Sequence, residues 1–237
     1  ATQYARNAMF SGLMPAEIEQ LHPEYWVSEE EEGSKNNFEA ELCEKQMQRL
    51  GIKHSFHYEK INNQRYGKKI VDQFKNLLNY DLNVLVYNFV DMLSHARTEM
   101  DVIRELAYDD KSYRSLTRSW FQNSYLMELL RQLSAHPVRL VVTTDHGAIR
   151  VNNPVKVIGD RRTTTNIRYK QGKNLSYPAN QVYEVQEPRQ IHLPRTNVSS
   201  TYIFSGNKDY MVYPNNYNHF VNHYRNTFQH GGISMEE

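Results

Sequence analysis

Two short runs of β-branched and aliphatic residues, with a helical stretch between them, constrain the fold of this chain more than any other feature. The runs are 82–90 and 138–142, and their continuous rather than alternating pattern predicts strands buried on both faces. Residues 113–136 carry apolar side chains at helical spacing. The order strand, helix, strand predicts a right-handed crossover in a parallel sheet, with a functional crevice at the carboxyl ends of the strands.

The other segments predict helices before this crossover and short strands after it. Residues 13–80 are longer than a crossover requires, so we expect part of them to form a helical cap insertion over the crevice. The expected fold class is therefore α/β, with a mostly parallel sheet flanked by helices, a helical cap and extra short strands in the last third. The predicted helices are 15–21, 38–50, 68–78 and 219–228, and the predicted short strands are 181–185, 201–204 and 210–213.

Length and charge limit the class of protein. A chain of 237 residues fits one domain spanning 1–237. Lys and Arg number 28 against 27 Asp and Glu, and this balance argues against a general nucleic-acid or membrane coat. No run approaches the roughly 18 apolar residues of a membrane span. The acidic run 29–34 is expected to be a solvated linker, and because the sequence opens in mid-pattern we expect a longer chain.

An Asp and a His follow the end of each aliphatic run. Asp91 and His95 lie four residues apart, so a helical turn beginning there would place both on one face. Asp145 and His146 are neighbours, and they converge on one ion only if the backbone turns, which Gly147 permits. A surface helix pair and a capped polar loop are the structural alternatives. Two such pairs at the ends of neighbouring strands favour a metal site.

The chemistry of these side chains narrows the choice of metal. Carboxylate and imidazole without thiolate suit Zn²⁺ or Mn²⁺. Cys43 is the single cysteine, which excludes an internal disulfide and a Cys-based zinc site and favours a reducing, cytoplasmic compartment.

Two residues near the ends of the chain have ordinary structural interpretations as well as functional ones. His230, before two glycines, is typical of a helix C-terminus. Thr2 is typical of an N-cap, and it becomes a nucleophile only if a metal or a base lowers the pKa of its hydroxyl.

A basic segment follows the second Asp–His pair. Residues 150–173 hold seven basic residues against Asp160, a net charge of about +6. A solvated charged hairpin and a phosphate-backbone contact are equally good interpretations, since Arg binds phosphate oxygens in pairs and Lys adds a point charge. Tyr169 and Tyr177 could stack on bases. The candidate substrate-binding residues are Lys156, Arg161, Arg162, Arg168 and Lys170.

Four motifs taken together resemble the PglZ domain of the alkaline phosphatase superfamily, essentially from Thr2 to His230. Within that family the similarity is to PorX-like response regulators, associated with type IX secretion in Bacteroidetes. Family members take one further ligand, an Asp after an upstream strand, which has no counterpart here. The motifs are Ala1-Thr2-Gln3-Tyr4-Ala5-Arg6-Asn7-Ala8, Asp91-x-x-x-His95, Thr144-Asp145-His146-Gly147 and His230-Gly231-Gly232.

The resemblance implies a two-zinc phosphodiesterase, with Mn²⁺ as the other candidate metal. Asp91, His95 and His230 would hold one zinc, while Asp145, His146 and the Thr2 oxygen would hold the second. Thr2, deprotonated on the metal, would attack phosphorus and give a covalent phospho-intermediate that water releases. Similarity to the superfamily's nucleotide phosphodiesterases favours diesters, so an oligonucleotide or a cyclic dinucleotide is the expected substrate.

The same resemblance implies partners. The domain would be the effector of a cytoplasmic response regulator with upstream receiver and helical domains, as a monomer or a homodimer, acting with a secretion-system or sigma-factor partner. The main alternative is a catalytically vestigial, metal-stabilised interaction domain that docks a secretion or transcription partner. A phosphomonoesterase or sulfatase would keep the metals and change the substrate.

Overall fold

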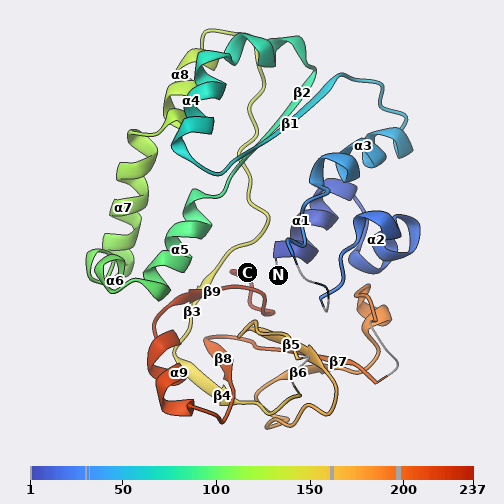
Figure 1. The fold of residues 1–237 in the computed structure, drawn as a ribbon, viewed down its shortest axis with the longest axis vertical. Coiled ribbons are helices and arrows are strands. Elements are labelled where there is room, and N and C mark those ends of the chain that lie inside the picture. Colours follow the sequence, from blue (N-terminus) through green and yellow to red (C-terminus); the bar gives the residue numbers. More distant parts are fainter. Residues whose placement is uncertain (1, 30, 32, 161–162, 196–198) are drawn as a thin grey trace. The chain divides into compact units, whose positions relative to one another are not determined.

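The computed structural model describes residues 2–29, 31, 33–160, 163–195 and 199–237. The chain divides into two compact units, the first formed by residues 1–50 with 144–237 and the second by residues 51–143 (Figure 1). The predicted cap insertion, 13–80, is therefore shared between the units. No helix in the described part of the chain is both long and apolar enough to cross a membrane.

The second unit begins with a parallel strand pair joined by a helix. Its first elements are β1 (Phe56–Ile61), α4 (Gln64–Asp72), the 3₁₀ helix η2 (Phe74–Asn79) and β2 (Leu82–Tyr87). The two strands run in register from Phe56 opposite Leu82 to Ile61 opposite Tyr87. Ile61 packs with Ile70 and Leu77 in the unit's buried core. Strand β2 therefore has a parallel partner, but that partner is β1 and not the predicted segment 138–142.

The predicted strand over 138–142 is wrong. These residues, all within the described part, form no strand. Val141 is 77% exposed and Val142 is 82% exposed, so the run is not buried on either face. The aliphatic composition of 138–142 resembles that of a parallel strand, but β2 takes its hydrogen bonds from β1 instead. The segment β1 was missed because charged Glu59 and Lys60 interrupt its apolar residues.

Four helices follow β2, and they correct a second prediction. They are α5 (Phe89–Glu99), α6 (Asp101–Leu106), α7 (Asp110–Gln122) and α8 (Tyr125–Leu133). The single helix expected over 113–136 is broken between α7 and α8. The break occurs because Ser124 caps the second helix, accepting a hydrogen bond from the Met127 amide at 3.2 Å.

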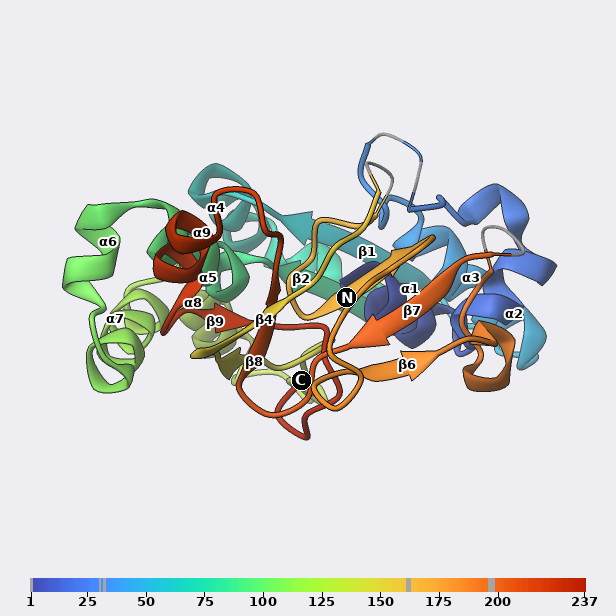
Figure 2. The same cartoon turned by 90° about the horizontal axis from the view of Figure 1, so that it is seen from below.

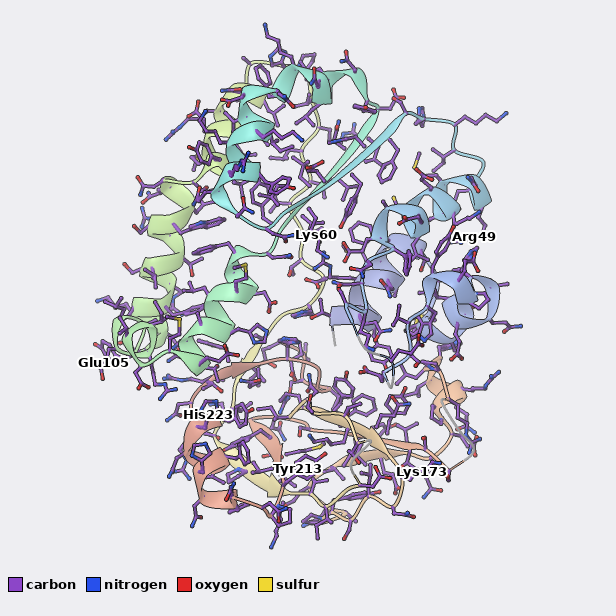
Figure 3. All side chains as sticks on the ribbon, in the orientation of Figure 1. Arg49, Lys60, Glu105, Lys173, Tyr213 and His223 are labelled. Atoms are coloured by element: carbon purple, nitrogen blue, oxygen red, sulfur yellow. The ribbon has the colours of Figure 1, made fainter. Side chains whose placement is uncertain are left out.

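The helices of the first unit come from the N-terminal fifty residues. They are α1 (Thr2–Ser11), α2 (Pro15–Leu21), the 3₁₀ helix η1 (Pro23–Tyr25) and α3 (Glu39–Arg49). Gly12 ends α1 with a positive φ of 61°, a conformation that glycine adopts at little cost. Arg49 of α3, labelled in Figure 3, donates to the Ser11 carbonyl at 2.6 Å and so holds the end of α1. The predicted helices 15–21 and 38–50 are confirmed as α2 and α3.

The last third supplies short strands and one helix, as predicted. Its elements are β3 (Ile149–Arg150), β4 (Asn153–Lys156), β5 (Tyr169–Gly172), β6 (Tyr183–Val185), the 3₁₀ helix η3 (Pro188–Ile191), β7 (Thr201–Phe204), β8 (Asp209–Val212), α9 (Tyr217–Tyr224) and β9 (Phe228–Gln229). Strands β5, β7 and β6 form an antiparallel sheet in that order, and Figure 2 shows β7 and β6 side by side. Strand β4 pairs in parallel with β8, and β3 pairs antiparallel with β9. The described strands thus form small sheets rather than one broad parallel sheet.

Candidate active site

The candidate nucleophile lies at the start of α1. Thr2 is the first residue of that helix, and its Oγ1 lies 3.1 Å from Nε2 of His146, 144 residues further along the chain. Both residues belong to the first unit. The first and third sequence motifs are therefore brought together by the fold of that unit.

The loop that carries Asp145 and His146 is held by close backbone packing. A Cβ atom on Gly147 would lie only 1.9 Å from the carbonyl oxygen of Glu236, so no larger residue fits without moving that segment. The Thr144 hydroxyl donates to the His146 carbonyl at 2.8 Å. The sequence pattern suggested that Gly147 permits a turn, but Gly147 is not one of the described glycines with a positive φ. The structure gives a different reason for glycine, the close approach of another backbone.

His230 is placed beside this loop by strand pairing. Strand β9, which ends directly before His230, pairs with β3, which follows the Asp145–Gly147 loop. The imidazole rings of His230 and His146 stack with centroids 4.1 Å apart and an angle of 19° between the planes. The expected helix C-terminus at this position is wrong, because α9 ends at Tyr224 and His230 follows a strand.

A backbone contact fixes which nitrogen of His146 carries the proton. Its Nδ1 lies 2.9 Å from the Gly147 carbonyl oxygen. A carbonyl only accepts hydrogen bonds, so Nδ1 donates and Nε2 of the neutral ring keeps a free lone pair. The Thr2 hydroxyl is then the donor toward Nε2. This arrangement, with the far nitrogen held by a carbonyl, is the one that orients a metal-binding histidine.

The donor set around Thr2 fits a divalent cation. Oδ2 of Asp145 lies 3.6 Å from Nε2 of His146, and Thr2 Oγ1 lies 3.1 Å from the same nitrogen. Tetrahedral zinc ligands with bonds of about 2.0–2.1 Å are roughly 3.3 Å from one another. Each of the two oxygens therefore lies at ligand spacing from the imidazole nitrogen, and the Asp145 and His146 side chains are only 23% and 13% exposed.

The other predicted pair lies on α5, in the second unit. Nε2 of His95 is 3.6 Å from Oδ1 of Asp91, and the helix places the two side chains one turn apart, as the spacing predicted. The first turn of α5 is held by Phe89, whose ring stacks on Trp120 with centroids 3.9 Å apart. The grouping of His230 with Asp91 and His95 stays a prediction.

A buried ion pair that the sequence did not reveal joins α1 to α3. Arg6 lies one turn after Thr2, and its guanidinium forms two contacts with Glu39, Nε to Oε1 at 2.7 Å and Nη2 to Oε2 at 2.8 Å. Nε of Arg6 is also 4.0 Å from Oδ2 of Asp145. No local pattern pairs Arg6 with a residue 33 positions away, so only the spacing of Thr2 and Arg6 was visible in the sequence.

The basic segment divides into exposed and buried residues. Lys156 is exposed at the end of β4. Arg168 is fully buried, and its guanidinium binds Glu237, Ser234 and backbone carbonyls. Lys170 is 1% exposed. Neither of these two side chains reaches the surface, so the fold gives them a structural role in place of the expected substrate contact. Arg161 and Arg162 lie outside the described residues.

The buried Lys170 makes the stability of the protein depend on pH. Its ammonium donates to the Thr164 carbonyl at 2.9 Å and lies 4.4 Å from the centre of the Tyr213 ring, and burial lowers its pKa to about 7. Between that pKa and the ordinary lysine value the unfolded chain binds more protons than the folded one. The contribution of Lys170 to the free energy of unfolding therefore rises with pH across that window.

Replacing Lys170 with methionine is expected to raise the urea midpoint at about pH 6, where the buried charge is most costly, and to raise it less at about pH 9. Tyr213 and Thr164 remain in place in this variant. Urea unfolding of both proteins at the two pH values measures the difference. A gain that is equal at both pH values would contradict the depressed pKa.

The first unit thus brings hydroxyl, carboxylate and imidazole groups together at the start of a helix, the donor types of a metallo-phosphoesterase. Over residues 1–237 the chain matches the family described as BREX system PglZ alkaline phosphatase-like domain, and it belongs to that family. The expected membership of the PglZ group is thereby confirmed. No curated protein sequence matches the chain.

Proposed function

We propose that this PglZ domain hydrolyses nucleotide-type phosphodiesters, with Thr2 as the nucleophile. The observation that carries the proposal is the contact between Thr2 Oγ1 and His146 Nε2, with Asp145 alongside. A threonine hydroxyl at the start of a helix usually caps that helix. Here it faces an imidazole and a carboxylate from a distant loop instead, which is the setting of an activated nucleophile.

We propose two zinc sites for this reaction. Thr2, Asp145 and His146 form one, and Asp91, His95 and His230 form the other. The ligand-like spacing within Thr2–His146–Asp145 and within Asp91–His95 supports these sets. Bound zinc supplies Lewis-acid stabilisation of phosphate charge and lowers the pKa of oxygen ligands.

The proposed hydrolysis takes place in two displacement steps at phosphorus, and the residues of this chain have defined roles in both. The Thr2 hydroxyl gives up its proton to solvent, and its Oγ1 forms a bond to phosphorus while the bond from phosphorus to the leaving alcohol oxygen breaks. That oxygen takes up a proton from solvent. Water then attacks the phospho-threonine, the Thr2 oxygen–phosphorus bond breaks, and the hydroxyl is restored. His146 and Asp145 orient Thr2, and exposed Lys156 is proposed to contact the substrate backbone.

Metal removal tests this function. Chelation followed by dialysis is expected to reduce hydrolysis of bis(p-nitrophenyl) phosphate to background, and added Zn²⁺ is expected to restore it. The corresponding monoester, p-nitrophenyl phosphate, should be hydrolysed more slowly. A faster monoester rate would indicate a phosphomonoesterase, and zinc binding without any hydrolysis would indicate an interaction domain.

The biological setting is proposed from the sequence motifs. We propose that the domain is the effector of a PorX-like response regulator in the cytoplasm, linked to type IX secretion, acting on oligonucleotides or cyclic dinucleotides. Phosphorylation of the full-length regulator should then change the rate of diester hydrolysis. An unchanged rate would separate the hydrolase from that regulatory role.

A further inference from the structure

The ion pair between Arg6 and Glu39 is buried and closely matched in geometry. Arg6 is 6% exposed and Glu39 is 1% exposed. Nη2 of Arg6 donates to Oε2 of Glu39 at 2.8 Å, and Nε of Arg6 lies 2.7 Å from Oε1 in the same ion pair. The charge-assisted hydrogen bond from Nη2 gives the guanidinium a preferred direction as well as a counterion. Burial of two charges is weak support for stability alone, because desolvation offsets most of the attraction.

The pair lies where it can act on the proposed nucleophile site. Arg6 follows Thr2 by one turn of α1, so both side chains project from the same side of the helix. Nε of Arg6 is 4.0 Å from Oδ2 of Asp145, the oxygen that also faces His146. Glu39, the first residue of α3, therefore connects through Arg6 to the loop that carries the proposed ligands.

We propose that Glu39 and Arg6 form a positioning pair for the Thr2 site. Arg6 holds the Asp145 carboxylate beside His146, and Glu39 neutralises Arg6 so that the charge of Asp145 remains available to a cation. This inference rests on the proposed function. Its physical basis is the sum of charges: Glu39 and Asp145 are negative and Arg6 is positive, so the group carries one net negative charge. Without Glu39 that net charge falls to zero.

Three variants separate charge from orientation. Zinc binding to the Thr2 site is titrated with a chromophoric chelator in a His95→Ala background, which removes the other proposed site. Glu39→Gln is expected to weaken zinc binding by about 10- to 100-fold. The double variant Glu39→Gln with Arg6→Gln keeps the wild-type net charge, so its zinc affinity should return to within about 3-fold of the parent.

Turnover is measured with His95 intact and zinc at saturation. The double variant should still show kcat lowered by about tenfold with KM little changed, because Asp145 has lost the guanidinium that orients it. Arg6→Lys keeps the charge and loses the two-point contact, so its zinc affinity should exceed that of Glu39→Gln while its kcat stays low.

A matched control is available on the same helix pair. Arg49 also joins α3 to α1, donating to the Ser11 carbonyl at 2.6 Å and the Gly12 carbonyl at 3.2 Å, at the end of α1 far from Thr2. Arg49→Gln should lower the thermal midpoint without changing zinc affinity or kcat. If Glu39→Gln behaves like Arg49→Gln, the positioning role is overturned while the hydrolase stands. If the parent binds no zinc and hydrolyses no diester, both proposals fail.

Discussion

Replacement of Thr2 with alanine is expected to abolish diester hydrolysis in a protein that stays folded. The Thr2 hydroxyl is the group that faces His146 Nε2 at 3.1 Å, and no other hydroxyl is proposed to attack phosphorus. Loss of a nucleophile lowers kcat by at least about a thousandfold in enzymes of comparable design. The assay is hydrolysis of bis(p-nitrophenyl) phosphate at saturating zinc, with zinc per chain measured on the same samples.

Two further variants at this position make the result specific. Thr2→Ser keeps the hydroxyl and should retain much of the activity, whereas Thr2→Val keeps the shape and should be as inactive as alanine. Zinc content should remain largely intact in all three, because Asp145 and His146 still provide ligands. Wild-type turnover in the alanine and valine variants would remove Thr2 from the mechanism.

Glu237→Gln is expected to lower the free energy of unfolding of the first unit by about 3–5 kcal/mol, because it removes the counterion of a buried charge. The Glu237 carboxylate binds Arg168 at Nε at 2.8 Å and also at Nη2, and it accepts a hydrogen bond from the Gly232 amide at 2.9 Å. The side chains of Arg168 and Glu237 are 0% and 2% exposed. The turn that follows His230 is therefore held by this network.

The fluorescence of a single tryptophan can report the unfolding of the first unit. Trp120 lies in the second unit and Trp26 in the first, so a Trp120→Phe background leaves fluorescence from the first unit alone. Glu187→Gln is the matched control, since Glu187 pairs with Arg195 at 3.0 Å in the same unit but its side chain is 55% exposed. The control should cost no more than about 1 kcal/mol. Equal losses in the free energy of unfolding for the two variants would show that the buried contacts of Arg168 with Glu237 do not stabilise the first unit.

The sequence allowed prediction of those elements whose pattern is local. Helices α2 and α3 and strands β6, β7 and β8 lie close to their predicted bounds, because turn residues and apolar period mark them directly. Strand β1 escaped because its apolar residues are interrupted by charges, and 138–142 misled because continuous aliphatic residues indicate a strand only when a partner is present. Pairing between strands is a tertiary property.

The candidate site was visible only as separate fragments. Resemblance to a family placed Thr2 with Asp145 and His146. The first unit brings Thr2 Oγ1 to 3.1 Å and Asp145 Oδ2 to 3.6 Å from Nε2 of His146. Their roles as ligands stay a prediction. Arg168 and Lys170 read as surface charges because a basic run is usually solvated, yet distant residues, above all Glu237, enclose Arg168. Glu39 gave no signal, since its partner is 33 residues away.

The division of the chain also sets an order of events during synthesis. Residues 51–143 are contiguous, so the second unit can fold as soon as they emerge from the ribosome, but the first unit needs residues 144–237 to join the fifty N-terminal ones. Until then α1 has its partner helix α3 but lacks the loop that carries Asp145 and His146, and such a partly folded nascent chain is exposed to chaperones and proteases. Thr2 meets His146 only after the residues between them have been synthesised, so a product released before that point carries no assembled nucleophile.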